Sequence, residues 1–78
     1  MVLGYGMDRD KLEEALERAE EQIVLGERKI ARQKEIIAEL VRAGQDAVKA
    51  KGLLAVYEGT QEIYITVRRL LRRQLALN

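Results

Sequence analysis

Apolar residues recur in alternating steps of four and three along the first half of the sequence. The positions are Leu12, Leu16, Ala19, Ile23, Gly26, Ile30, Gln33, Ile37 and Leu40. This heptad rhythm is typical of a helix that lays one narrow seam against another helix. The chain contains no proline that would break such a helix. The pattern predicts a long helix over about residues 8–43, with Asp8 or Asp10 as its N-cap.

The break in the rhythm after residue 43 has the composition of a tight turn. Gly44 suits the left-handed position just past a helix end, and Asp46 suits the start of a second helix. We predict a turn over 44–46 and a second helix over about 47–76. Because a short connection makes two helices antiparallel neighbours, residues 8–78 should form an all-α helical hairpin. Residues 1–7 are predicted to be a flexible N-terminal tail.

The second helix carries more apolar surface than one partner needs. Its apolar residues come in adjacent pairs, at 53–54, 56–57, 63–64 and 70–71. A stripe this wide must contact more than one neighbour, and the first helix supplies only one. A chain of 78 residues without cysteine also has no disulfide to stabilise it. We therefore expect a coiled-coil-like homodimer, a four-helix bundle made of two hairpins.

One segment of the second helix conflicts locally with this prediction. The run Ile63–Val67 is β-branched and aromatic, and in isolation it would favour a strand. Gly59 lies four residues earlier and weakens a helix. The helical spacing on both sides of the run favours a helix, and a kink or loosened turn near Gly59 is the main alternative.

Antiparallel pairing about the turn predicts which residues face each other. Gly26 should face Ile63 and Tyr64, and Gln33 should face Val56 and Tyr57. Gln33 is a polar residue at a seam position, so its amide needs a hydrogen-bond partner, for which Tyr57 or Gln61 is available. The residues predicted to form the core and dimer seam are Leu16, Ile23, Gly26, Ile30, Gln33, Ile37, Leu40, Leu54, Tyr57, Tyr64 and Leu71.

The residue types that usually carry catalysis or bind metals are scarce. The chain has no histidine and no cysteine, and its carboxylates are spaced to pair with Lys or Arg on exposed helix faces. We expect no catalytic residues, no metal and no cofactor. Small helical chorismate mutases hold a dicarboxylate with arginines, and Arg28 and Arg32 could imitate such a pair. That enzyme class is a weaker alternative, because it needs three helices.

Basic residues gather in two places. Arg28, Lys29 and Arg32 lie in the middle of the first helix, and Arg68, Arg69, Arg72 and Arg73 lie near the end of the second. Both groups could contact phosphates of RNA or DNA, as the Rop-type helical hairpins do. The favoured interpretation is that the last four arginines pair with the acidic start of the first helix, which the hairpin places beside them.

The stretch from Gly26 to Leu54 resembles a group of short uncharacterised proteins common in rhizobial alphaproteobacteria. The resemblance rests on Glu27–Arg28, Ala31–Gln33, Leu40, Gly44, Asp46, Ala50 and Leu53–Leu54, and further on Glu58, Gln61, Arg68 and Leu71. Members often carry histidines where this chain has Gln45 and Tyr64. The resemblance implies a small, helical, cytoplasmic bacterial protein and no particular activity.

The most economical function for this sequence is non-enzymatic. We expect a homodimeric protein-interaction module whose partners are a second copy and another protein, with nucleic acid as the alternative. No apolar run is long enough to span a membrane, and the lack of cysteine suits a reducing cytoplasm.

Overall fold

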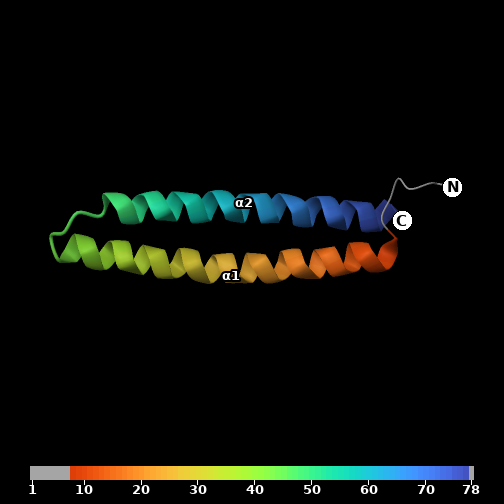
Figure 1. The fold of residues 1–78 in the computed structure, drawn as a ribbon, viewed down its shortest axis with the longest axis horizontal. Helices are drawn as coiled ribbons and strands as arrows, with labels where there is room; N and C mark the ends of the chain where they lie inside the picture. The colour runs from red at the N-terminus through yellow and green to blue at the C-terminus, as the bar shows by residue number, and fades with distance from the viewer. Residues whose placement is uncertain (1–7, 78) are drawn as a thin grey trace.

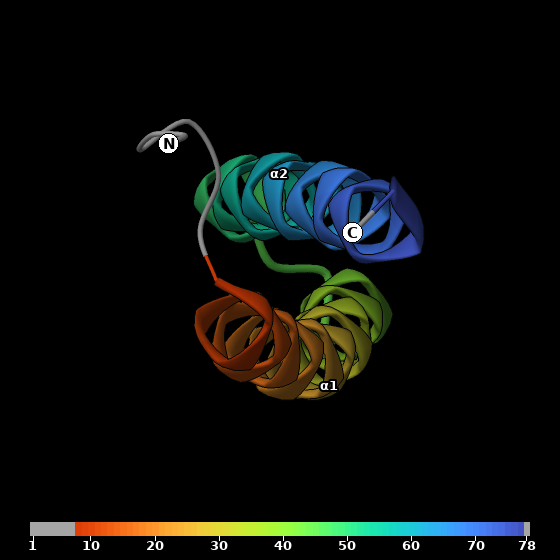
Figure 2. The same ribbon diagram turned by 90° about the vertical axis from the view of Figure 1, so that its right-hand side faces the viewer.

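The chain folds as two long antiparallel helices lying side by side. The computed structural model describes residues 8–77, so the predicted tail over residues 1–7 lies outside the described residues. Helix α1 spans Arg9–Arg42 and helix α2 spans Val48–Leu77. The two helices pack along their length and form a rod about 63 Å long (Figure 1). The end-on view shows one helix lying over the other across the described residues (Figure 2). The predicted all-α hairpin is confirmed.

Short polar side chains satisfy the exposed backbone groups at the start of each helix. The Asp8 carboxylate accepts a hydrogen bond of 2.9 Å from the backbone N–H of Lys11, so Asp8 rather than Asp10 caps α1. The Asp46 carboxylate accepts one of 2.9 Å from the N–H of Val48, the first residue of α2. Each bond satisfies an amide that has no partner within its own helix.

Helix α1 ends where the sequence predicts a left-handed residue. Gly44 has a φ of +69°, which costs a glycine little and other residues about 1 kcal/mol or more. The N–H of Gln45 then donates to the carbonyl of Leu40 at 2.9 Å, which satisfies one of the free carbonyls of the last turn.

The connection between the helices runs back along α1 before α2 begins (Figure 1). Residues 45–47 belong to neither helix, and Ala47 is buried against the hairpin. Because the connection runs back along α1, α2 starts beside α1 rather than level with its end (Figure 1). The predicted facing residues are therefore wrong by several positions. Gly26 faces Gln61, and not Ile63, which is 63% exposed.

Helix α2 is continuous across the segment that conflicted with a helical assignment. Both Gly59 and the run Ile63–Val67 lie inside the unbroken helix Val48–Leu77. No break interrupts this helix at Gly59, so the predicted helix is confirmed there. The heptad spacing prevails over β propensity because it lets Tyr64 lie against α1, whereas a strand would turn alternate residues of the run away from it.

The interior of a single hairpin is small. In the described part of the chain, the buried apolar residues are Leu12, Ala19, Ile23 and Ala47, and no large side chain is fully enclosed. Two buried polar residues, Gln33 and Gln61, share the same interface. A two-helix rod thus leaves much of its apolar surface in contact with water.

Candidate interaction surface

Helix α2 meets α1 through a heptad seam that complements the seam of α1. Its buried and half-buried residues recur in steps of three and four along the helix. They are Ala50, Leu54, Tyr57, Gln61, Tyr64, Arg68, Leu71 and Leu75, with Ile65 half-buried beside Tyr64, and Ala47 continues the spacing just before the helix. In each adjacent pair singled out from the sequence, the second residue belongs to this seam. The first residue of each pair is left outside it.

Those outer residues form a second heptad seam on α2, which we call the apolar stripe. The apolar stripe consists of Leu53, Val56, Thr60, Ile63, Val67, Leu70, Gln74 and Leu77. Its six large apolar residues are between 37% and 77% exposed. At about 100° per residue, the apolar stripe lies about 100° around α2 from the seam that faces α1, because each stripe residue directly precedes a seam residue. Single exposed apolar residues are ordinary, but a continuous heptad row is the pattern of a helix–helix contact.

The apolar stripe borders a groove between the two helices. The groove has a volume of about 180 Å³ and is lined by Leu25 and Lys29 of α1 and by Val56, Thr60 and Tyr64 of α2, among others. The side of the hairpin that carries this groove and the apolar stripe is called the groove face below. The Lys29 ammonium lies 5.7 Å from the ring centre of Tyr57, which is within cation–π range.

The opposite side of the α1–α2 interface is charged. Helical spacing places Glu20 and Glu27 of α1 there, together with Lys51, Glu58 and Arg72 of α2. An Arg72 guanidinium nitrogen lies 3.1 Å from a carboxylate oxygen of Glu20, so the two helices are joined by an ion pair on this side. The hairpin therefore has one face suited to water and one face suited to another protein surface.

Two buried amides join the helices in opposite directions. Gln33 of α1 donates from Nε2 to the carbonyl of Ala50 in α2 at 3.0 Å. Gln61 of α2 donates from Nε2 to the carbonyl of Ile23 in α1 at 2.8 Å. The predicted partners of Gln33, Tyr57 and Gln61, are both wrong, because the set-back start of α2 brings a backbone carbonyl closer. Sequence reasoning also missed Gln61 as a second seam amide, although its spacing from Tyr57 and Tyr64 indicates it.

Gly26 provides the space that Gln61 occupies. A Cβ atom at position 26 would collide with Oε1 and Cδ of Gln61. The Gln61 Oε1 atom is itself buried without a hydrogen-bond partner among the described residues. The small residue at position 26 is thus required by a long polar side chain from the other helix, and not by the backbone.

Nothing within the hairpin requires a glycine at two other helical positions, Gly52 and Gly59. A Cβ atom at Gly52 or Gly59 would meet nothing within 4 Å. Each glycine costs about 1 kcal/mol of helix stability relative to alanine. Both residues lie directly beside the apolar stripe, on the side away from α1, where a missing side chain would let another helix approach closely.

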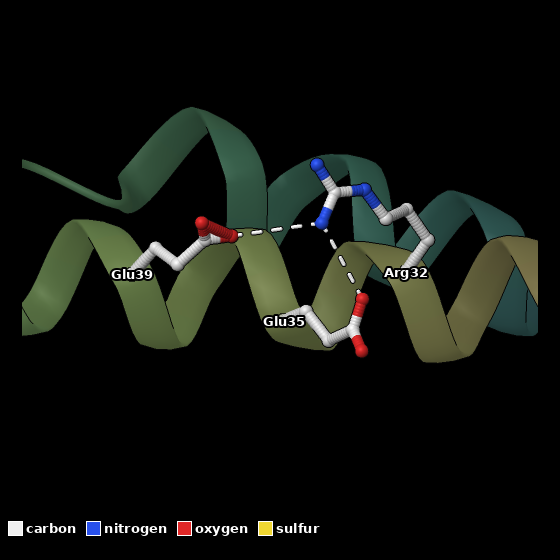
Figure 3. Close-up of polar contacts among 3 residues, drawn as sticks. All are labelled: Arg32, Glu35 and Glu39. Atoms are coloured by element: carbon white, nitrogen blue, oxygen red, sulfur yellow. Dashed lines mark hydrogen bonds and ion pairs between the residues drawn. The ribbon is translucent and has the colours of Figure 1, made fainter.

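The basic residues are partly neutralised by carboxylates, and they do not form one patch. One Arg32 nitrogen lies 3.4 Å from Glu35 and 3.6 Å from Glu39, on the exposed side of α1 (Figure 3). These contacts occupy the group that a phosphate or a dicarboxylate would need. Arg28 is exposed on the same helix.

The C-terminal arginines spread around α2 instead of sharing a side. Arg68 is half-buried on the seam toward α1, whereas Arg69, Arg72 and Arg73 are exposed. Only the Arg72–Glu20 contact is an ion pair between this group and the acidic start of α1 in the described residues. The predicted pairing of these arginines with the acidic start of α1 is therefore confirmed for Arg72.

The residues predicted to form the core and dimer seam lie between α1 and α2. Ile23 and Gln33 are buried; the half-buried ones are Leu16, Gly26, Ile30, Ile37, Leu40, Leu54, Tyr57, Tyr64 and Leu71. They hold the hairpin itself together. The residues left free for a second molecule are those of the apolar stripe, which the sequence marked only as the first members of adjacent pairs.

Comparisons with protein-family models, with curated proteins and with solved structures found no match for this chain. Neither α1 nor α2 combines the length and the apolar character that crossing a lipid bilayer requires.

Proposed function

We propose that this chain is a non-enzymatic helical interaction module that pairs with a second copy to form a four-helix bundle, and that the bundle binds another protein. The observation that supports this proposal is the apolar stripe. It repeats the heptad spacing of the α1–α2 interface, yet nothing in the described hairpin covers it. At about 25 cal/mol per Å², covering such a row removes a large free-energy cost that a lone hairpin bears.

A second copy is the occupant that best explains the marginal interior of one hairpin. Four buried apolar residues are too few to hold two long helices together, and helical hairpins commonly recover stability by doubling. The groove face offers a surface that is the same on both copies, as a two-fold interface requires. The charged side of the hairpin then forms the outer surface that meets water and other proteins.

The test compares two valines of similar exposure. Val56 lies on the apolar stripe and is 61% exposed, whereas Val41 lies on α1 away from it and is 58% exposed. We expect light scattering to give a mass of two chains for the parent protein at micromolar concentration. Val56→Glu should reduce the mass to one chain, because the carboxylate would be buried without a partner. Val41→Glu should leave the mass of two chains unchanged.

A lone chain for the parent protein at 100 μM, a concentration on the order of a weak dimer's Kd, would overturn the proposal. Equal effects of Val56→Glu and Val41→Glu would overturn the role of the apolar stripe. Circular dichroism follows helix content, and Leu70→Glu repeats the test at a second stripe position. RNA or DNA binding that falls steeply with salt would favour the nucleic-acid alternative instead.

A further inference from the structure

We infer that the two copies meet through their α2 helices in an antiparallel arrangement, with the two-fold axis passing beside Ile65. This inference rests on the proposed function, which supplies the second copy. It adds the direction and the register of the contact. Three features of the hairpin carry it: the composition of the groove face, the extent of the apolar stripe, and the charge distribution along α1.

The composition of the groove face decides which helices meet. Two hairpins stacked face to face about a two-fold axis place α2 against either the partner's α2 or the partner's α1. On α1, the positions equivalent to the apolar stripe include Arg18, Lys29 and Arg32. Pairing α2 with the partner's α1 would bury these cations against Ile63 and its neighbours, which is costly without paired anions. Pairing α2 with α2 places apolar side chains against apolar side chains.

Stacking α2 on the partner's α2 about this axis makes the two helices antiparallel and matches the apolar stripe to itself. About a centre at Ile65, Leu53 lies beside the partner's Leu77, and Ile63 lies beside the partner's Val67. Thr60 then meets the partner's Leu70. The overlap extends over about 36 Å at 1.5 Å per residue. The open positions at Gly52 and Gly59 flank this contact, so the helices can approach closely there.

The extent of the apolar stripe fixes the register. The stripe runs from Leu53 to Leu77, so its midpoint is level with residue 65 of α2. An antiparallel contact centred there matches every member of the stripe with another member on the partner. A shift of one heptad toward the turn would leave Gln74 and Leu77 beyond the end of the partner's stripe.

Charge is distributed along α1 in a way that agrees with the antiparallel direction. The first half of α1 is rich in acids, including Glu14 and Glu21, and its middle carries Arg28 and Lys29. Tyr64 of α2 lines a groove with Ala19 and Gln22 of α1, so the two-fold axis passes close to residue 21 of α1. Each acidic start then lies beside the partner's Arg28. Parallel α1 helices would place acid beside acid.

Spin labels measure the direction directly. The chain contains no cysteine, so Lys51→Cys carries the only thiol. Lys51 is exposed and lies on the charged side, away from the apolar stripe. In the antiparallel dimer the two labels should be about 42 Å apart along the helices, at 1.5 Å per residue. A distance below about two helix diameters, ~25 Å, would overturn the antiparallel contact of α2 with α2.

Other outcomes of the same measurement separate the register from the proposed function. A distance shorter by about one heptad, ~10 Å, would overturn the register but keep the direction. Absence of dipolar coupling at a concentration where light scattering shows one chain would overturn the proposed function itself. Dipolar coupling is therefore measured on samples whose mass has been determined.

Discussion

Replacing Gly26 with alanine should destabilise the protein, although alanine is the better helix former. The methyl group would occupy the position of the Gln61 amide, whose Oε1 and Cδ atoms are too close to a Cβ at position 26. The amide must then leave the interface, and the 2.8 Å hydrogen bond from Gln61 to the carbonyl of Ile23 is lost. The expected sign of the change is therefore opposite to that of an exposed helical glycine.

The size of this change in the free energy of unfolding follows from three terms, two unfavourable and one favourable. Loss of the buried hydrogen bond costs about 1 kcal/mol, and the packing that the Gln61 side chain loses on leaving the interface costs about 1–2 kcal/mol more. Alanine stabilises the helix by about 1 kcal/mol relative to glycine through its higher helix propensity. Gly26→Ala should thus lower the free energy of unfolding by about 1–2 kcal/mol.

A double-mutant cycle separates the collision from other effects. In a Gln61→Ala background the space is empty, so Gly26→Ala should raise the free energy of unfolding by about 1 kcal/mol. Urea unfolding followed by circular dichroism at one fixed chain concentration measures all four variants. A coupling energy of about 2–3 kcal/mol is expected. Equal effects of Gly26→Ala in the two backgrounds would refute the interlocking of Gly26 with Gln61.

Three further changes test the caps and the surface charges by the same unfolding assay. Asp8→Ala should cost about 1 kcal/mol, because the N–H of Lys11 loses its acceptor, and no loss would argue against the cap. Gly44→Ala should destabilise by about 1 kcal/mol because of the positive φ at this position, and no loss of stability would contradict this reasoning. Arg72→Ala should cost less than about 1 kcal/mol, since its ion pair with Glu20 is exposed, and a larger loss would show a buried role.

Local sequence signals predicted the elements of this fold well. Gly44 predicted the end of α1 because only a left-handed residue lets the chain turn there, and Asp46 predicted the start of α2. The heptad spacing of Leu12 to Leu40 identified the seam of α1, because a period of three and four leaves a helix with one apolar side. Each of these features depends on residues that are neighbours along the chain, so the order of the amino acids is enough to deduce them.

The alignment of the two helices could not be deduced in the same way. It depends on residues 45–47 staying outside both helices and lying back along α1, which no periodicity indicates. That displacement changed the partner of Gln33 from a side chain to the carbonyl of Ala50. It also placed Gln61 opposite Gly26. For the candidate site, the sequence showed that α2 has too much apolar surface, but only packing shows which residue of each pair remains exposed.

In the proposed dimer, the thin interior of each hairpin would make the lifetime of the protein in a cell depend on its concentration. Association stabilises a folded chain by mass action, so the folded fraction of a protein that depends on its second copy rises with concentration. Newly made chains at low numbers would stay open to proteases, which degrade unfolded polypeptides continuously. The amount of folded protein would then rise more than proportionally with the rate of synthesis, and no modification or ligand would be required.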